Sequence, residues 1–247
     1  MSQRRVDLPT PDGVLDCYVF EPADAGGSPV PGLVLYMDAF AIRPALASMA
    51  ERLASNGFVV ALPNLYYRSA PFPPFDPHLV AAGGAERERF SSMIKSIDGA
   101  MVMRDTEAVI ALLDRTPTVR RGSIGAVGYC MGGGYALSAA GTFPERVSVA
   151  ASFHGGSLAT ASPHSPHLLA ARMRAKLYIG VAELDPSFSA EQRALLERTL
   201  TDAGVDYELE VYQGAKHGFA VTGHLVYDAA ASERHWERLV ALLRESL

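Results

Sequence analysis

A cysteine lies at the centre of the pentapeptide G-Y-C-M-G at 128–132, between an apolar run at 124–127 and a run of small residues at 133–140. This context is typical of a strand that turns sharply into a helix. Such a turn brings the two backbones so close that glycine is needed two residues before and two residues after the central residue. The pattern predicts a nucleophile elbow that presents the Cys130 thiol at a helix N-terminus, where the helix dipole favours a thiolate.

A thiol nucleophile needs a base for its proton, and the base needs an orienting partner. In α/β-hydrolase folds the chain order is nucleophile, acid, histidine. Downstream of Cys130, Asp185 lies in the loop after a predicted strand at 176–181, and His217 lies in the loop after a predicted strand at 207–211. Both loops follow the carboxyl end of a strand, which is the edge where open parallel sheets bind ligands. The sequence therefore predicts a catalytic triad for acyl transfer.

Two of these assignments have alternatives. Glu183 lies in the same acidic loop as Asp185, and we favour Asp185 because its shorter side chain is the commoner triad partner of a histidine. Asp185 also precedes Pro186 and could instead cap the helix expected at 187–203. His217 is flanked by glycines, which favours a catalytic role over that of a solvated loop histidine.

Polar groups are also predicted at two other strand ends. Asp38 ends the apolar run at 32–37, and a buried carboxylate is costly without partners, so we expect it to lie in a polar substrate pocket. The alternative is that Asp38 caps a helix beginning near Arg43. The backbone N–H groups of Ala39 and Met131 are predicted to form the oxyanion hole.

The remaining histidines are assigned more simply. His154 follows a predicted strand at 147–153 and is expected to line the substrate pocket or to make a structural hydrogen bond. His164 and His167 lie together in an irregular segment, but no other ligand is near them, so no metal site is predicted. Three further histidines are expected at the surface: His78, His224 and His235.

The second cysteine, Cys17, lies in the segment 15–20, where apolar and polar residues alternate. We expect it to be a packed strand residue without a reactive role. A disulfide between Cys17 and Cys130 is not expected, because it would hide the elbow sulfur and would not suit a reducing compartment.

The elements that would position these residues alternate between strands and helices along the chain, which predicts an α/β fold with a mostly parallel sheet. The segment 14–21 suits an antiparallel edge strand. A proline-rich stretch at 66–86 is expected to be an irregular loop, a candidate lid or pocket wall. Short apolar runs predict buried strands at 33–37, 58–62, 122–129, 147–153, 176–181 and 207–211, and helical spacing predicts helices at 46–54, 101–113, 191–203 and in the C-terminal segment.

Composition excludes several functional classes. With 247 residues and no linker or repeat, the chain is expected to form a single domain over 1–247. The net charge of −5, without a basic stripe, argues against a nucleic-acid partner. No window resembles a signal peptide or a membrane-spanning segment, so we expect a soluble, cytoplasmic protein that does not bind membranes. The sequence does not predict an oligomeric state.

The same residues resemble the dienelactone hydrolase family. The similarity rests on G-Y-C-M-G-G at 128–133, the segment 33–40, N-G-F at 56–58 leading into L-P-N-L-Y at 62–66, and K-H-G-F-A at 216–220, and so spans nearly the whole chain. It implies an α/β-hydrolase fold with a sheet of about seven or eight strands and helices on both faces. It also implies a Cys130, Asp185 and His217 triad.

Two departures from the family concern the substrate. The family commonly has a glutamate at the position of Asp38, held against the resting thiol, and arginines that bind the substrate's carboxylate. Here the aspartate is shorter, and Val221 stands where the dienelactone enzymes have a substrate-binding arginine. Arg87 or Arg89 could serve as the other arginine, so the presence of a carboxylate clamp is left open.

We therefore expect a hydrolase of small esters or lactones that forms an acyl-enzyme on Cys130 and needs no metal or organic cofactor. One alternative is a catalytically idle protein with the hydrolase fold that binds a small ligand or a protein partner. Another is a redox-sensing thiol, which would need a resolving cysteine nearby.

Overall fold

The computed structural model describes residues 2–23, 27–69 and 71–247. Its centre is an eight-stranded sheet in the order β1-β2-β4-β3-β5-β6-β7-β8. β1 pairs antiparallel with β2, β2 pairs antiparallel with β4, and all further pairs are parallel. The strands are β1 (Ser2–Thr10), β2 (Gly13–Glu21), β3 (Gly32–Tyr36), β4 (Val59–Pro63), β5 (Ile124–Tyr129), β6 (Val147–Phe153), β7 (Lys176–Leu184) and β8 (Tyr207–Lys216).

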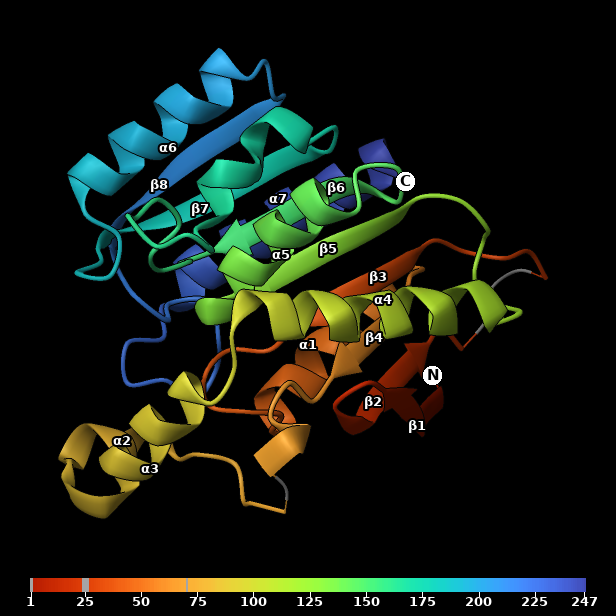
Figure 1. Ribbon diagram of the computed structural model, residues 1–247, viewed down its shortest axis with the longest axis horizontal. Coiled ribbons are helices and arrows are strands. Elements are labelled where there is room, and N and C mark those ends of the chain that lie inside the picture. Colours follow the sequence, from red (N-terminus) through yellow and green to blue (C-terminus); the bar gives the residue numbers. More distant parts are fainter. Residues whose placement is uncertain (1, 24–26, 70) are drawn as a thin grey trace.

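Helices cover both faces of the sheet (Figure 1). α4, α5 and α6 lie on one face, and α1 and α7 lie on the other, where the Arg52 guanidinium stacks 4.6 Å from the Trp236 ring centre. Burial on both faces explains why every residue of β3, β4 and β5 is buried. The helices are α1 (Pro44–Ser55), α2 (Pro77–Ala82), α3 (Gly84–Lys95), α4 (Gly99–Arg115), α5 (Met131–Thr142), α6 (Ala190–Asp202) and α7 (Ala229–Ser246), with 3₁₀ segments η1 (Tyr67–Ser69) and η2 (Pro166–Arg172).

The predicted α/β-hydrolase architecture is confirmed, and each predicted apolar run overlaps a strand, with bounds that differ by a few residues. The expectation that 14–21 forms the edge strand is wrong, because β1 lies outside β2. The expectation of an irregular loop at 66–86 is also wrong in part, because this stretch contains η1, α2 and the start of α3. Ala70, within that stretch, lies outside the described residues. No helix in the described part of the chain is long and apolar enough to span a membrane.

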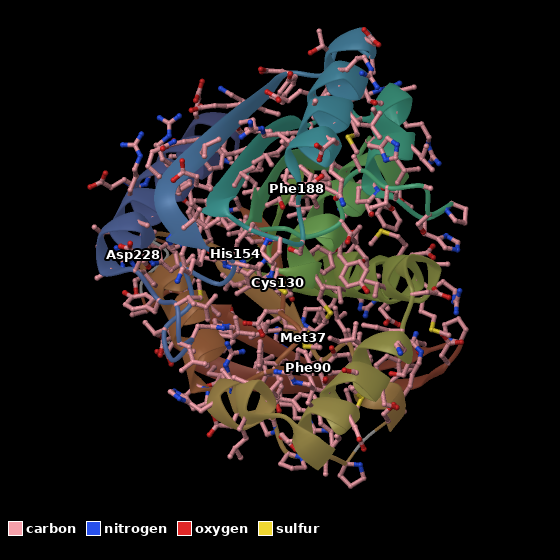
Figure 2. The ribbon with its side chains drawn as sticks, turned by 90° about the vertical axis from the view of Figure 1, so that its left-hand side faces the viewer. Met37, Phe90, Cys130, His154, Phe188 and Asp228 are labelled. Atoms are coloured by element: carbon pink, nitrogen blue, oxygen red, sulfur yellow. The ribbon has the colours of Figure 1, made fainter. Side chains whose placement is uncertain are left out.

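The carboxyl ends of the parallel strands meet at one edge of the sheet, which Figure 2 views directly. Met37 follows β3, Cys130 follows β5 and His154 follows β6, and all three are labelled close together at this edge. α2 and α3 lie beside the same edge (Figure 1). The sheet therefore brings the ends of separate strands together at the place where the sequence predicts a site.

Candidate active site

Cys130 lies at the turn between β5 and α5, as the glycine pattern predicts. Its backbone adopts φ 56° and ψ −123°, a conformation that is costly for a residue with a side chain and is typical of strained functional turns. A Cβ atom at Gly128 would lie 1.9 Å from the carbonyl oxygen of Gly132, and one at Gly132 would lie 2.5 Å from that of Met37. Only glycine fits at either position, and the close approach brings the chain after β3 against the first turn of α5.

His217 connects Cys130 to Asp185. The Nε2 atom of His217 lies 3.1 Å from the Sγ of Cys130, and its Nδ1 lies 2.7 Å from Oδ2 of Asp185. The alternative acid, Glu183, instead accepts a hydrogen bond from the backbone N–H of Gly214 at 2.7 Å. Of the two carboxylates in this loop, it is Asp185 that contacts the histidine.

Ser187 is a member of the site that sequence reasoning missed. Its hydroxyl lies 2.6 Å from Oδ1 of Asp185 and 3.0 Å from Nδ1 of His217, and its backbone N–H donates to the same Asp185 oxygen at 2.8 Å. Because Nδ1 of His217 donates to Oδ2, the hydroxyl of Ser187 is free to donate to Oδ1. The carboxylate is thus held on both oxygens in the orientation that the histidine needs. The D-P-S sequence after β7 is the available signal, but the same sequence also suits an ordinary helix start.

The electrostatics of these groups favour a charged imidazole. Burial disfavours the charged form of His217, but the contacts with Asp185 and Cys130 outweigh it and raise the pKa of His217 to about 10. Burial likewise opposes the charge of Asp185, yet hydrogen bonds from His217 and Ser187 lower the pKa of its carboxyl group. A protonated imidazole is therefore favoured between the carboxylate and the sulfur.

The second cysteine has different surroundings. Cys17 is fully buried in β2. Burial, followed by the neighbouring charge of Asp16, raises the pKa of the Cys17 thiol to about 12. Cys130 is partly exposed, and both cysteines are free thiols.

The two backbone groups predicted for the oxyanion hole belong to segments that contact one another. Met131 is the first residue of α5, so its N–H has no acceptor within the helix, and the N–H of Ala39 has no acceptor among the described residues. The hydroxyl of buried Tyr66 donates to the carbonyl oxygen of Ala39 at 3.1 Å and lies 3.5 Å from the sulfur of Met131. Tyr66 therefore bridges the two segments, a role that the sequence did not reveal.

Asp38 is completely buried and has its own partners. Arg43 donates to both carboxylate oxygens at 2.7 and 2.8 Å, the backbone N–H of Phe40 donates at 2.9 Å, and Nε2 of His224 lies 3.3 Å from Oδ2. Burial alone would raise the pKa of Asp38, but His224 and Arg43 outweigh it and lower it to about 2. The N-cap of α1 is Arg43, with no side-chain cap, so Asp38 does not cap that helix.

Two histidines expected at the surface lie inside the protein. The side chain of His224 is 9% exposed and packs against Asp38. His235 is fully buried, where its Nε2 lies 3.0 Å from the Tyr129 hydroxyl and its Nδ1 contacts the carbonyl oxygen of Ser232. Sequence reasoning missed both because Asp38, which contacts His224, and Tyr129, which contacts His235, are distant in the sequence.

His154 is fully buried beside the triad and has φ 38°. Its ring lies edge-on to the rings of His217 and Phe219, each at 5.3 Å between centres, and neither ring nitrogen has a hydrogen-bond partner among the described residues. Burial, followed by the charge of His217, lowers the pKa of His154 well below its usual range. His154 is thus a neutral neighbour of His217 that does not reach an open surface.

The arginines considered for a carboxylate clamp have other partners. Arg87 donates to the carbonyl oxygens of Val80 and Ala81 at the end of α2. Arg89 binds Glu86 through two hydrogen bonds and lies over the ring of Phe75. Val221, at the position where the sequence departs from the family's arginine, is fully buried. A clamp built from Arg87 or Arg89 would have to break these contacts.

Comparisons with known proteins show sequence similarity over nearly the whole chain. The model of the Dienelactone hydrolase family matches residues 15–247. The "Putative carboxymethylenebutenolidase" of Synechocystis sp. is 26% identical over 247 residues, which cover 98% of this chain and 96% of that protein. The "Probable 2-oxo-3-(5-oxofuran-2-ylidene)propanoate lactonase" of Bradyrhizobium sp. is 28% identical over 243 residues, which cover 97% of this chain and 92% of that protein.

Solved structures show the same fold. A promiscuous phosphotriesterase from metagenomic libraries, described as dienelactone hydrolase-like, superposes with a TM-score of 0.79 at 25% identity and covers 99% of this chain and 98% of its own. The family match extends over both the elbow and the loop of His217. The chain therefore belongs to the dienelactone hydrolase family.

Proposed function

We propose that this protein hydrolyses small neutral esters or lactones through a Cys-His-Asp triad and an acyl-enzyme. The observation that carries the proposal is the continuous set of contacts from Asp185 through His217 to the sulfur of Cys130. The names of the relatives, which include a lactonase, support a lactone as one substrate type. Strained lactones and activated esters suit a thiolate nucleophile better than amides do.

In the acylation step, the thiolate of Cys130 attacks the carbonyl carbon and forms a C–S bond. The N–H groups of Met131 and Ala39 stabilise the negative oxygen of the tetrahedral intermediate. The C–O bond to the leaving group then breaks, and Nε2 of protonated His217 donates its proton to the departing oxygen. The products are a thioester on Cys130 and a neutral His217.

In the deacylation step, neutral His217 accepts a proton from water as the water oxygen attacks the thioester. A second tetrahedral intermediate forms at the same oxyanion site, and the C–S bond breaks to release the carboxylic acid. The sulfur leaves as a thiolate beside the newly protonated His217, which restores the starting state. Asp185 keeps the imidazole oriented in both steps.

The surroundings of the site favour a neutral substrate. Arg43 is neutralised by Asp38, and Arg89 by Glu86. A cluster of aromatic rings extends from Phe40, in the loop after β3, to Phe90 on α3, with centres 4.7 Å apart. We infer that these rings form an apolar wall of the substrate site, and with Arg43 and Arg89 already paired such a wall would not repay the desolvation of a substrate carboxylate.

The test is a comparison of hydrolysis rates on a panel of lactones, aryl esters and thioesters, with a matched pair of lactones that differ only in one carboxylate. We expect the neutral lactone to be hydrolysed at least as well as the carboxylated one. A strong preference for the carboxylated lactone would mean that an arginine forms a clamp after all. Binding of these compounds without turnover would instead support the idle binding protein.

A further inference from the structure

The loop that carries Ala39 (residues 37–43, the oxyanion loop) and the loop that carries His217 (residues 217–228, the histidine loop) come from distant parts of the sheet. We propose that the cluster of Asp38, Arg43 and His224 ties these two loops together and thereby positions the N–H of Ala39 for catalysis. This inference rests on the proposed function.

The Asp38 carboxylate forms the centre of the cluster. Arg43 binds it through two parallel hydrogen bonds and also donates to the carbonyl oxygen of Ala41 at 3.2 Å. The same carboxylate accepts from the N–H of Phe40. These bonds hold the backbone directly after Ala39, including Ala41 at φ 67°, in a strained turn that would otherwise relax. Both carboxylate oxygens are thus engaged within the cluster.

His224 supplies the connection to the histidine loop. Its Nε2 lies 3.3 Å from Asp38 and 3.1 Å from Nη2 of Arg43, and its ring lies edge-on to Phe40 at 4.8 Å between centres. On its other side the ring covers Gly218, where an added Cβ would lie 3.1 Å from Nδ1 of His224. Gly218 directly follows His217. His224 therefore links the backbone beside the catalytic histidine to Asp38 and Arg43 of the oxyanion loop.

Other contacts hold the oxyanion loop but do not reach the histidine loop. Tyr66 donates to the carbonyl oxygen of Ala39, and the N–H of Phe75 donates to the carbonyl oxygen of Phe40 at 3.2 Å. His217 has independent contacts to Asp185 and Cys130. Loss of His224 should therefore detach the oxyanion loop from the histidine loop, and so shift the N–H of Ala39 relative to the sulfur, while leaving the triad in place.

The variant His224→Ala removes the tie and keeps the buried Asp38–Arg43 pair. Asp38→Ala is less suitable, because it would strand the buried charge of Arg43 and could prevent folding. His224→Gln retains a side-chain N–H that can donate to Asp38, and is the conservative rescue. His78→Ala is the matched control, since His78 is an exposed histidine on α2.

The experiment compares p-nitrophenyl acetate with its thiono analogue, in which sulfur replaces the carbonyl oxygen. Sulfur is larger and a weaker acceptor, so N–H groups aimed at oxygen favour the ester. Iodoacetamide alkylation of Cys130 forms no oxyanion and reports only on the thiolate and His217. Thermal unfolding shows whether each variant remains folded.

For His224→Ala we expect kcat for the ester to fall about 10-fold or more, because a displacement of about 1 Å can cost up to about 100-fold. KM should stay within about twofold, since the lost interaction acts in the transition state. The ratio of ester to thionoester rates should fall about 10-fold, with alkylation unchanged. His224→Gln should recover most of the ratio, and His78→Ala should resemble the wild type.

An unchanged rate ratio in His224→Ala would overturn the inference, and so would a parallel loss of ester hydrolysis and alkylation, which would indicate general disruption. A wild type that hydrolyses neither substrate while Cys130 is still alkylated would instead refute the proposed function, and this inference with it. These failures are distinguishable because the first two require an active wild type.

Discussion

The Sγ atom of Cys130 lies 3.1 Å from Nε2 of His217, although 87 positions of sequence separate the two residues. They follow β5 and β8, which are three strand positions apart in the sheet, or about 14 Å at about 4.8 Å per strand. The loop after β8 and the two side chains must therefore cross this separation. The register shift between Ala182 and Leu184 in the β7–β8 pairing is the kind of irregularity that bends strands.

The first prediction concerns the two cysteines. Brief treatment of the native protein with iodoacetamide should label Cys130 and not Cys17, because Cys17 is buried and its thiol has a raised pKa of about 12. Peptide mass mapping measures the labelling, and denatured protein, in which both cysteines should react, is the control. Preferential labelling of Cys17 in the native state would contradict this account.

The triad should behave as one unit. His217→Ala should lower kcat by about 100-fold or more, since general acid–base catalysis is lost. The double variant His217→Ala, Asp185→Asn should be about as slow as His217→Ala alone, because both changes disable the same proton transfer. Glu183→Gln is the matched control and should stay near wild-type activity. If Glu183→Gln proves crippling and Asp185→Asn mild, the acid has been misassigned.

Ser187 should contribute to turnover by orienting Asp185. We expect Ser187→Ala to lower kcat about 10-fold, because a hydrogen bond to a charged group is worth about 1.5 kcal/mol. Ser189→Ala is the control: Ser189 caps α6 by accepting from the N–H of Gln192, so its loss should cost about 1 kcal/mol of stability and leave kcat unchanged. Equal kcat values in the two variants would refute the role of Ser187.

The raised pKa of His217 also predicts a pH dependence of stability. An unfolded histidine has a pKa of about 6.5, whereas the pKa of His217 in the folded protein is about 10, so protonation of His217 favours the folded state. This contribution is complete below about pH 6.5 and is lost as the pH rises through about 10. The difference in unfolding free energy between wild type and His217→Gln, measured in urea, should shrink across this range. A difference that grows with pH would have the wrong sign.

The sequence predicted those parts of the site that are encoded locally. The glycines around Cys130 are required by backbone contacts within the elbow itself, and Asp185 and His217 directly follow strands that their apolar residues identify. Ser187 was missed because a serine after proline is also an ordinary helix start. Tyr66 and His224 were missed because their partners, Ala39 and Asp38, become neighbours only when the sheet forms.

The strands and helices also divide into those with a local apolar pattern, which the sequence predicted, and those without one. Buried strands such as β3 and β5 were predictable because burial on both faces demands continuous apolar runs. β1 was not, since most of Ser2–Thr10 is exposed at the edge of the sheet and leaves no apolar pattern. α3 has no buried residue, so the helical periodicity that identified α4 is missing, and its placement depends on the partly buried ring of Phe90 against Phe40 and Phe75.

The central claim is that Cys130 becomes acylated during turnover. The most direct measurement is rapid acid quenching of the enzyme with p-nitrophenyl acetate, followed by peptide mass mapping. The account predicts one acetyl group on the peptide that contains Cys130, formed at the rate of the first burst of nitrophenol and absent in Cys130→Ala. Hydrolysis without an acetylated Cys130, or undiminished hydrolysis by Cys130→Ala, would contradict it.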